Sequence, residues 1–473
     1  MRTNKFSIFN FQFSTIIVLC AIMSSCGVYK KYQSPEYTPD DLFGDSLISE
    51  DQIRATEDSL VAGAEISWRD FFTDPYLQEL IDSALARNTD VQSARLTLEK
   101  AQASLKAAKL AYLPSLSLAP TGGISGTYGS SSGMSGPSWT YSIPLQLDWN
   151  IGISGSVTVN KRKANAVLLQ AEAQRDAMQA NIISTVAQLY YELMLLDKEL
   201  EILISTDSLW EVSLETQRAL WENGQSYSTA VNQMESSNLS VKTQIVDTKR
   251  SILQVENSLC KLLVITPQHI NRNDWGEFTL PERFGRGIPS QLLENRPDIR
   301  LANHTLEEAF YNTAAARAAF YPSFSLSGLL GWTTEGFTAD PAGLLMKLAA
   351  TLTQPIFQQG KLRASLKIAK LNQEDKLNQY VQTVIDAGNQ VNECLADCQV
   401  AQDKYLLYKR QVEVLHDAYN GTHELMNNGK ASYLEVLTAQ ESLLSAQLNE
   451  ATNLYNGSQA LIALYIALGG ATK

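Results

Sequence analysis

The stretch that decides the fold is WTYSIPLQLDW, residues 139–149. Its odd-numbered positions are all apolar and its even-numbered positions are polar or proline, the period of a β-strand with one apolar face. Ten steps of ~3.3 Å, tilted by about 40°, rise roughly 25 Å, the height of an outer-membrane barrel's apolar band, with Trp139 and Trp149 at its rims. A half-buried strand of a soluble sheet has the same alternation, so both interpretations stay open. Pro144 points to an edge strand or a bulge, because proline cannot donate a hydrogen bond to a neighbouring strand.

The N-terminus has the layout of a bacterial secretory signal. Basic residues precede an apolar core, Ile16 to Met23, which is too short for a stable membrane helix. Ser24-Ser25-Cys26 resembles a lipobox, in which the cysteine becomes the lipidated first residue of the mature protein. We therefore predict a signal peptide over 1–25, lipidation of Cys26, and an extended, lipid-anchored segment over 26–67. The alternative is an ordinary exported protein with a cysteine there by chance.

The composition excludes several classes of protein. The chain has 38 basic and 50 acidic residues, a net charge of −12, so no nucleic-acid-binding patch is expected. Once the signal peptide is removed and Cys26 is acylated, only Cys260, Cys394 and Cys398 remain, so the exported chain has no disulfide framework. The mature chain has no run of eighteen apolar residues, which argues against a helical membrane span. Any spanning must be done by strands.

No pattern of catalytic residues is found in the sequence. A Gly-x-Ser-x-Gly motif and a phosphate-binding glycine loop are both absent, and the four histidines show no ligand spacing. Cys394 and Cys398 have the spacing of a metal-binding pair, but both fall on a helical seam, where packing is the better interpretation. The sequence predicts no enzyme activity, no metal site and no cofactor.

The chain contains an internal repeat. Residues 94–118 align without gaps on 302–326, at an offset of 208, with twelve identities in 25 positions. Each copy runs from an Ala-rich helical pattern to a proline, Pro114 or Pro322, and then into alternation typical of a strand. The first repeat is placed at 68–274 and the second at 275–473, each with one strand pair. The predicted strand pairs occupy 113–158 and 322–357.

Very long helices follow the strand pairs. Lys161–Trp221 has no Gly or Pro and predicts roughly 90 Å of helix. From Tyr380 to Met426 a 3-4 spacing of mostly apolar residues is typical of a coiled coil. Asn223-Gly224 and Asn428-Gly429 then follow as C-terminal caps, and another helical pattern begins after each. The predicted fold is mainly α with a small β part, built from two antiparallel coiled-coil hairpins.

Counting the strands leaves two kinds of protein. Four strands per chain cannot close a membrane barrel, since the smallest natural barrels have eight. Either several chains pool their strands into one barrel, or the strands belong to a lipid-anchored periplasmic scaffold without a pore. Alternation bounded by tryptophans favours pooling, because a scaffold has no use for it.

Two motifs carry a resemblance to a known family. LLENRPDIRLANHTLEEAFYNTAAARAAFYPSFSLSG, residues 292–328, is similar to the Arg-Pro-Asp segment of the outer membrane efflux proteins, the TolC-like channel subunits. QPIFQQGKLRA, residues 354–364, resembles their strand-to-helix junction. The resemblance covers nearly all of the mature chain and is greatest to the NodT type of lipoprotein. It implies a homotrimer in the outer membrane, with a twelve-stranded barrel and a periplasmic tunnel of helices.

The same resemblance implies partners and a mechanism. A periplasmic adaptor and an inner-membrane transporter would engage the hairpin tips, at Asn223, Gly224, Asn428 and Gly429, while outer-membrane lipids surround the barrel. The protein would be a passive duct. Glu435 falls where the family places an aperture acid, and a threefold ring of acids would favour cations. The alternative for Glu435 is a solvated glutamate on a helix face.

Overall fold

The computed structural model describes residues 30–35, 67–125, 128–129, 133–134, 138–274, 295–335 and 343–470. The predicted signal peptide 1–25 and the predicted lipidation site Cys26 lie outside these residues. Of the predicted anchored segment 26–67, residues 30–35 and Ser67 are described.

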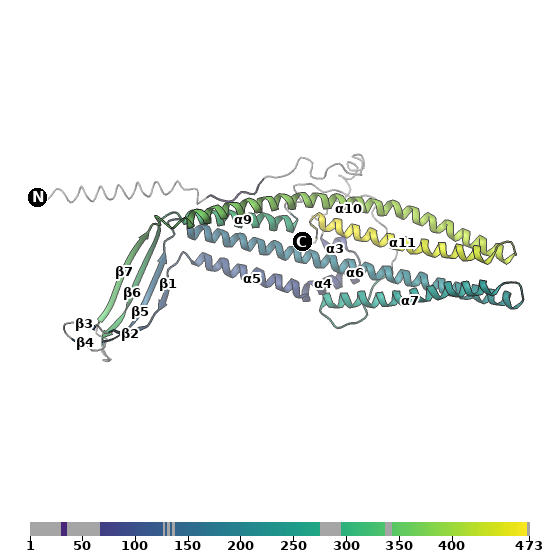
Figure 1. Ribbon diagram of the computed structural model, residues 1–473, viewed down its shortest axis with the longest axis horizontal. Helices are drawn as coiled ribbons and strands as arrows, with labels where there is room; N and C mark the ends of the chain where they lie inside the picture. The colour runs from purple at the N-terminus through teal and green to yellow at the C-terminus, as the bar shows by residue number, and fades with distance from the viewer. Residues whose placement is uncertain are drawn as a thin grey trace. The chain divides into compact units, whose positions relative to one another are not determined.

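Two long helical hairpins and one small sheet make up most of the described chain (Figure 1). The helices are α3 (Trp68–Phe71), α4 (Pro75–Arg87), α5 (Thr89–Leu110), α6 (Ser156–Glu222), α7 (Ser228–Leu263), α9 (Pro297–Ala318), α10 (Lys361–Asn427) and α11 (Tyr433–Ala467). The strands are β1 (Ser115–Leu118), β2 (Thr121–Ser125), β3 (Tyr128–Gly129), β4 (Gly133–Met134), β5 (Ser138–Asn150), β6 (Ser323–Glu335) and β7 (Gly343–Thr353). The predicted mainly α fold with a small β part is confirmed.

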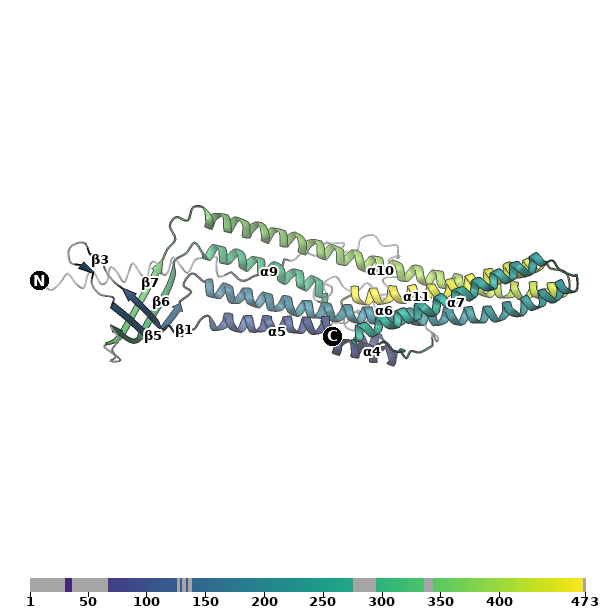
Figure 2. The same cartoon turned by 60° about the horizontal axis from the view of Figure 1, so that its bottom comes forward.

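The repeat is visible in the elements. Helices α6 and α10 each have 67 residues, and α5 and α9 each have 22. In both views α7 runs alongside α6 and α11 runs alongside α10 (Figure 2). The predicted strand pairs were slightly too long, because helix α6 already begins at Ser156 and β7 ends at Thr353. Pro355, which has no N–H, follows directly.

The chain divides into two compact units. One consists of residues 97–171 and 301–380, which contain the sheet and the helical segments that adjoin it, together with residues 30–35. Its sheet is antiparallel in the order β1-β5-β6-β7, and β2 pairs with the part of β5 that β1 leaves free. The sheet therefore has four strand positions, as predicted, and the first is interrupted at Ala119-Pro120.

The residue type of Pro144 suggested an edge strand or a bulge, and this prediction was wrong. Pro144 lies in β5, which pairs with β6 on one side and with β1 and β2 on the other. Its carbonyl accepts a hydrogen bond from Ala119 N (3.1 Å), at the break between β1 and β2. On the other side it faces Gly331, where a Cβ would lie 2.4 Å from the carbonyl oxygen of Ile143. The proline fits an inner strand because one neighbour is interrupted and the other has no side chain there.

The second unit contains the two hairpins, from residues 172–300 and 381–470, together with α3, α4 and the start of α5. Its main core gathers buried side chains of α4, α6 and α7 with Ile462 and Tyr465 of α11. The α10 seam is buried from Tyr380 to Ala401 and half-buried from Tyr405 to Met426. Cys394 and Cys398 lie in the buried part, where the seam pattern placed them.

Among the helices that the structure describes, none has an apolar stretch long enough to cross a bilayer.

Candidate functional site

One face of the sheet is apolar and open to its surroundings. The strand register places the odd-numbered residues of β5 opposite even-numbered residues of β6, which in turn face even-numbered residues of β7. The exposed or half-exposed apolar side chains of this face are Leu116, Leu118, Ile124, Trp139, Tyr141, Ile143, Leu145, Leu147, Trp149, Leu326, Leu330, Trp332, Met346, Leu348 and Leu352. The opposite face is mainly Ser, Thr, Gly and other polar residues, with Lys347 among them. An uncovered apolar surface of this extent marks a membrane or an interface.

The two predicted rim tryptophans lie at the two ends of β5 on this apolar face. Trp149 lies at the end that leads into α6, and its Nε1 donates to the carbonyl of Tyr112 (2.9 Å). Trp139 lies opposite Ile124 at the other end and is 40% exposed. An indole with an apolar ring and a hydrogen-bonded N–H suits a membrane boundary. Their role at the membrane rim stays a prediction.

The sheet has two open edges. Among the described strands, β7 pairs only with β6, and β1 and β2 pair only with β5. Each edge leaves a row of backbone N–H and C=O groups without a strand partner, which costs far more in lipid than in water. An apolar face with two open edges is an incomplete membrane structure.

The two hairpin tips share one turn geometry. Gly224 and Gly429 have φ of +72° and +70°, the left-handed conformation that favours glycine. In each tip the glycine N–H and the next N–H bond back into the last helical turn, the pattern of a Schellman cap. The side chains of Asn223 and Asn428 donate to carbonyls of their own helices, at 2.7 and 2.9 Å. The predicted caps are confirmed, and the adaptor contact stays a prediction.

Glu435 is exposed in the first turn of α11 and belongs to a capping box. Its backbone N–H donates to Ser432 Oγ (3.4 Å), and its carboxylate accepts from Ser432 N (3.3 Å). The Ser-x-x-Glu spacing in the sequence is typical of this motif, but our sequence analysis did not predict it. The carboxylate is therefore held in place at the tip, and its aperture role stays a prediction.

A buried arginine joins three elements at the Arg-Pro-Asp motif. Arg296 is 6% exposed and forms two hydrogen bonds with Asp298, of 3.0 and 2.6 Å. It also donates to the carbonyl of Ala467 at the end of α11 (2.7 Å) and to Gln390 of α10 (2.8 Å). The motif thus connects the start of α9 with α10 and with the end of α11. Sequence reasoning recognised the motif and missed this role, because its partners are distant in the chain.

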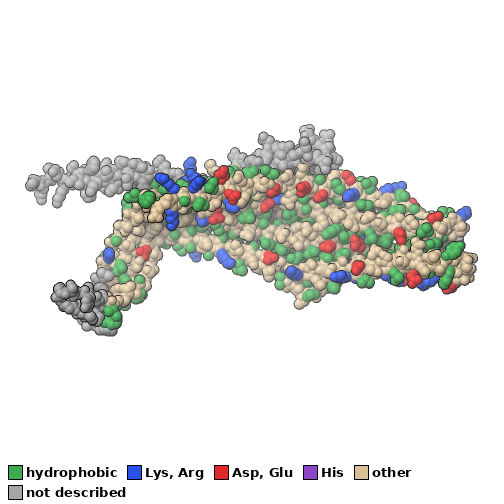
Figure 3. Space-filling view, in the orientation of Figure 1, with side chains coloured by type: hydrophobic (Ala, Val, Ile, Leu, Met, Phe, Trp, Pro, Cys, Tyr) green, Lys and Arg blue, Asp and Glu red, His purple; other side chains and the backbone are tan. Residues whose placement is uncertain are grey.

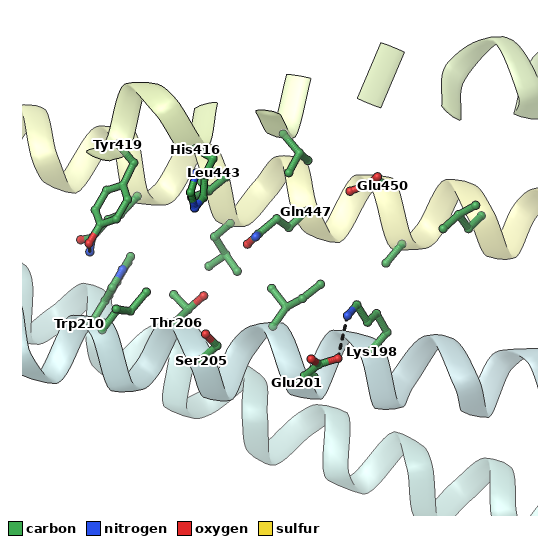
Figure 4. A pocket seen from close by; sticks show the side chains of 17 residues that line it. Lys198, Glu201, Ser205, Thr206, Trp210, His416, Tyr419, Leu443, Gln447 and Glu450 are labelled. Carbon is green, nitrogen blue, oxygen red and sulfur yellow. Dashed lines mark hydrogen bonds and ion pairs between the residues drawn. The ribbon is translucent and has the colours of Figure 1, made fainter. Parts of the chain in front are cut away.

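The two hairpins enclose a cavity of about 530 Å³ between α6, α10 and α11 (Figure 4). Trp210 and Gln440 line it, and the indole N–H and the amide oxygen have no hydrogen-bond partner among the described residues. At its other end lie the Lys198–Glu201 pair (2.8 Å) and Glu450, whose pKa is raised by burial. Packing between the hairpins is therefore loose here, in keeping with the half-buried part of the α10 seam. In the described residues no cluster of His, Cys, Asp or Glu could hold a metal.

Solved structures define the class of protein. The open state of the Neisseria gonorrhoeae MtrE outer membrane channel matches with a TM-score of 0.82 and 27% identity, over 94% of this chain and 98% of that one. A sheet with an uncovered apolar face, followed by long helical hairpins, is thus the architecture of an outer-membrane channel subunit.

The sequence profile of the outer membrane efflux proteins matches residues 80–263 and 288–470, and the chain belongs to this family. Its relatives include the cation efflux system protein CusC of Escherichia coli, 28% identical over 95% of this chain and 96% of that protein. The probable outer membrane lipoprotein SilC of Salmonella typhimurium is 28% identical, and the match covers 97% of each chain. The chain is therefore an outer-membrane efflux channel component and not an enzyme.

Proposed function

We propose that three copies of this chain pool their sheets into one twelve-stranded barrel, which carries exported solutes through the outer membrane as a passive duct. The observation that supports this most is the combination of one apolar face with two open edges. Pairing β7 of one copy with β1 and β2 of the next satisfies both edges, and three repetitions close the ring. The polar face then lines the water-filled interior.

The proposal extends to the ends of the molecule. The hairpin tips at Asn223-Gly224 and Asn428-Gly429 meet a periplasmic adaptor and an inner-membrane transporter, the other parts of a tripartite efflux system. Glu435 contributes one acid per copy to a ring at the periplasmic aperture. The loose packing between the hairpins supports movement at this end, because elements with few buried contacts move most readily.

Lipidation of Cys26, after removal of residues 1–25, is part of the proposal. Residues 30–35 belong to the sheet-containing unit and are bonded to its helices, because Tyr32 donates to Asn303 (2.7 Å) and Arg162 donates to the carbonyl of Lys30 (3.1 Å). A lipid on Cys26 is therefore only a few residues from a fixed point. Replacing Cys26→Ser should abolish incorporation of labelled palmitate, and label retained in that variant would refute the anchor.

The barrel is tested by the mass of the unheated, detergent-extracted protein, followed by single-channel recording of the same sample. We expect a trimer that conducts. A monomer, or an assembly without conductance, would overturn the pooled barrel.

A matched pair of variants tests which face meets the lipid. Leu348 lies on the apolar face and is 71% exposed, whereas its neighbour Ala349 lies on the polar face. Lysine near the centre of a lipid-facing strand costs about 2–4 kcal/mol. We expect Leu348→Lys to lower the yield of membrane-inserted trimer strongly and Ala349→Lys to leave it nearly unchanged. Equal yields of the two variants would contradict the assignment of faces.

A further inference from the structure

The four helix ends that adjoin the sheet carry only positive charge. Residues 100–110 of α5, 156–166 of α6, 309–318 of α9 and 361–371 of α10 contain eleven Lys and Arg and no Asp or Glu. The whole chain has 50 acidic residues among 473, so this exclusion of acids opposes the overall composition. We call these four segments the basic collar. On the visible face of the molecule, blue side chains gather where the helices adjoin the sheet (Figure 3).

Much of the collar charge has no counterpart in the protein. Lys163 pairs with Glu308 at 3.8 Å, and Lys161 lies over the ring of Tyr112 at 5.9 Å. The basic residues of the α10 segment are all exposed, and among the described residues they form no ion pair. Like charges on one unit repel one another, so the collar is at its most stable beside an external anion.

The first turn of α10 is a second, independent indication that the collar binds an anion. The first turn of a helix favours acidic side chains, because its free N–H groups carry partial positive charge. Helices α6 and α10 have no acid in their first turns, and α10 places Lys361 and Arg363 there. Lys361 and Arg363 therefore destabilise the isolated helix end slightly, and a bound anion would offset this cost.

The surroundings identify the anion. Between the apolar sheet face and the collar lie Leu113, Ile356 and Phe357, which are 62%, 95% and 83% exposed, together with Trp149 and Tyr112. Apolar, then aromatic, then basic groups follow one another in the order of acyl chains, interface and headgroups in a bilayer leaflet. A soluble anion would give no reason for the exposed apolar residues beside the charges.

We infer that the basic collar binds the headgroups of anionic phospholipids in the leaflet that faces the helices. This inference rests on the proposed membrane-spanning sheet. The chain downstream of Cys26 adds to the collar, because Arg162 holds the backbone of Lys30, and Lys30 and Lys31 are both exposed. A basic surface next to a lipid anchor supplies the second attachment that one acyl chain needs for stable membrane binding.

The test uses the full-length protein reconstituted with acyl-brominated lipids, which quench nearby tryptophans, and Trp149, at the helix end of the sheet, is the tryptophan beside the collar. The ratio of quenching by brominated phosphatidylglycerol to quenching by brominated phosphatidylcholine gives the relative association of the two headgroups. We expect a preference of roughly fivefold for phosphatidylglycerol at low salt, reduced at high salt by screening.

Two variants with the same change in charge locate the effect. Replacing Lys361, Arg363, Lys367 and Lys370 with Gln should reduce the preference at least about threefold. The control replaces Lys249, Arg250, Lys404 and Lys409, which are exposed on helices of the other unit, and should retain the preference. Helical circular dichroism confirms that both variants fold, and the salt dependence of the unaltered chain supplies a test that needs no variant.

The outcomes separate this inference from the proposed function. Equal quenching by the two lipids in the unaltered chain, or equal effects of the two variants, would overturn the collar assignment while leaving the barrel intact. Absence of quenching by either lipid would instead overturn the spanning sheet itself.

Discussion

The two repeats close the same joint with different side chains. In the first, Asn88 donates to the carbonyl of Leu262 at the end of α7 (3.1 Å). In the second, Arg296 donates to the carbonyl of Ala467 at the end of α11 (2.7 Å). The donors are 208 residues apart and the acceptors 205 apart, the offsets of the repeat itself.

The difference between the joints lies in how much each one holds. Asn88 otherwise caps α5, through Asp90 N (2.8 Å) and Val91 N (3.3 Å). Arg296 also binds Asp298 and Gln390, and so connects α9, α10 and α11. Both repeats keep a hydrogen bond from the residue directly before α5 or α9 to the end of α7 or α11, although the donor side chain differs. The second repeat has the stronger joint.

The largest effect is expected from removing that stronger donor. Arg296→Ala leaves a buried carbonyl without its donor and separates three elements, at a cost of about 3–5 kcal/mol in the free energy of unfolding. Asn88→Ala removes a cap and one buried hydrogen bond, at a cost of about 1–2 kcal/mol. Urea unfolding followed by circular dichroism compares the two. Equal losses would show that the joints are equivalent after all.

A second contrast lies in the sheet, at glycines that occupy equivalent places in the two repeats. Gly331 faces Pro144 so closely that a Cβ would lie 2.4 Å from a backbone oxygen, while Gly123 has only Thr140 Oγ1 within reach, at 3.9 Å. We expect Gly331→Ala to destabilise the sheet by about 1–3 kcal/mol and Gly123→Ala to have a smaller effect. The midpoint of unfolding by tryptophan fluorescence measures both. Tolerance of Ala at 331 would mean that β5 and β6 separate more easily than their register suggests.

Sequence reasoning identified the regular elements and missed contacts between distant segments. The helices from Lys161 and from Tyr380 were predictable because a long 3-4 seam without proline allows little else. The position of Pro144 was not, because it depends on Gly331 and on the interruption at Ala119-Pro120. The partners of Arg296 were hidden for the same reason. The capping box at Glu435 was readable from local spacing alone and was overlooked.

The seams of the long helices differ as well. Cys394 and Cys398 of α10 occupy the places that Leu189 and Leu193 occupy in α6, 205 residues earlier. Burial raises the pKa of Cys394 from its ordinary value of 9.0 to about 11, and that of Cys398 to about 12. As the pH rises past 9, the thiols of the unfolded chain therefore lose their protons before those of the folded chain. The free energy of unfolding falls from about pH 9 until the pH exceeds the raised pKa values of the folded protein, about 11 and 12.

At pH 10 this loss amounts to about 1 kcal/mol for each thiol. Urea unfolding between pH 7 and 11 should show a steeper decline in the unaltered chain than in the Cys394→Ala, Cys398→Ala double variant, in which neither site ionises. Parallel declines in the two proteins would place the alkaline sensitivity elsewhere, for example in the buried tyrosines.

The smallest effect on stability and the clearest test of function come from the starts of α7 and α11 at the hairpin tips. The first repeat begins α7 after Tyr227, which forms no side-chain cap, and has the buried Ala230 where the second repeat has the exposed Glu435. Glutamine also serves in a capping box, so Glu435→Gln should change stability by less than about 0.5 kcal/mol. Ser432→Ala, which breaks the box and keeps the acid, should cost about 1 kcal/mol.

The variants Glu435→Gln and Ser432→Ala thus separate the effect of the negative charge from the effect of the capping box. If Glu435 lines the aperture, Glu435→Gln lowers the cation preference of single channels while Ser432→Ala retains it, because only the first change removes the ring of charge. Glu222→Gln, at the end of α6 in the first tip, is the matched control and should leave the preference unchanged. A cation preference that survives Glu435→Gln would leave Glu435 as a helix cap alone, and the two tips would then differ in stability but not in their part in conduction.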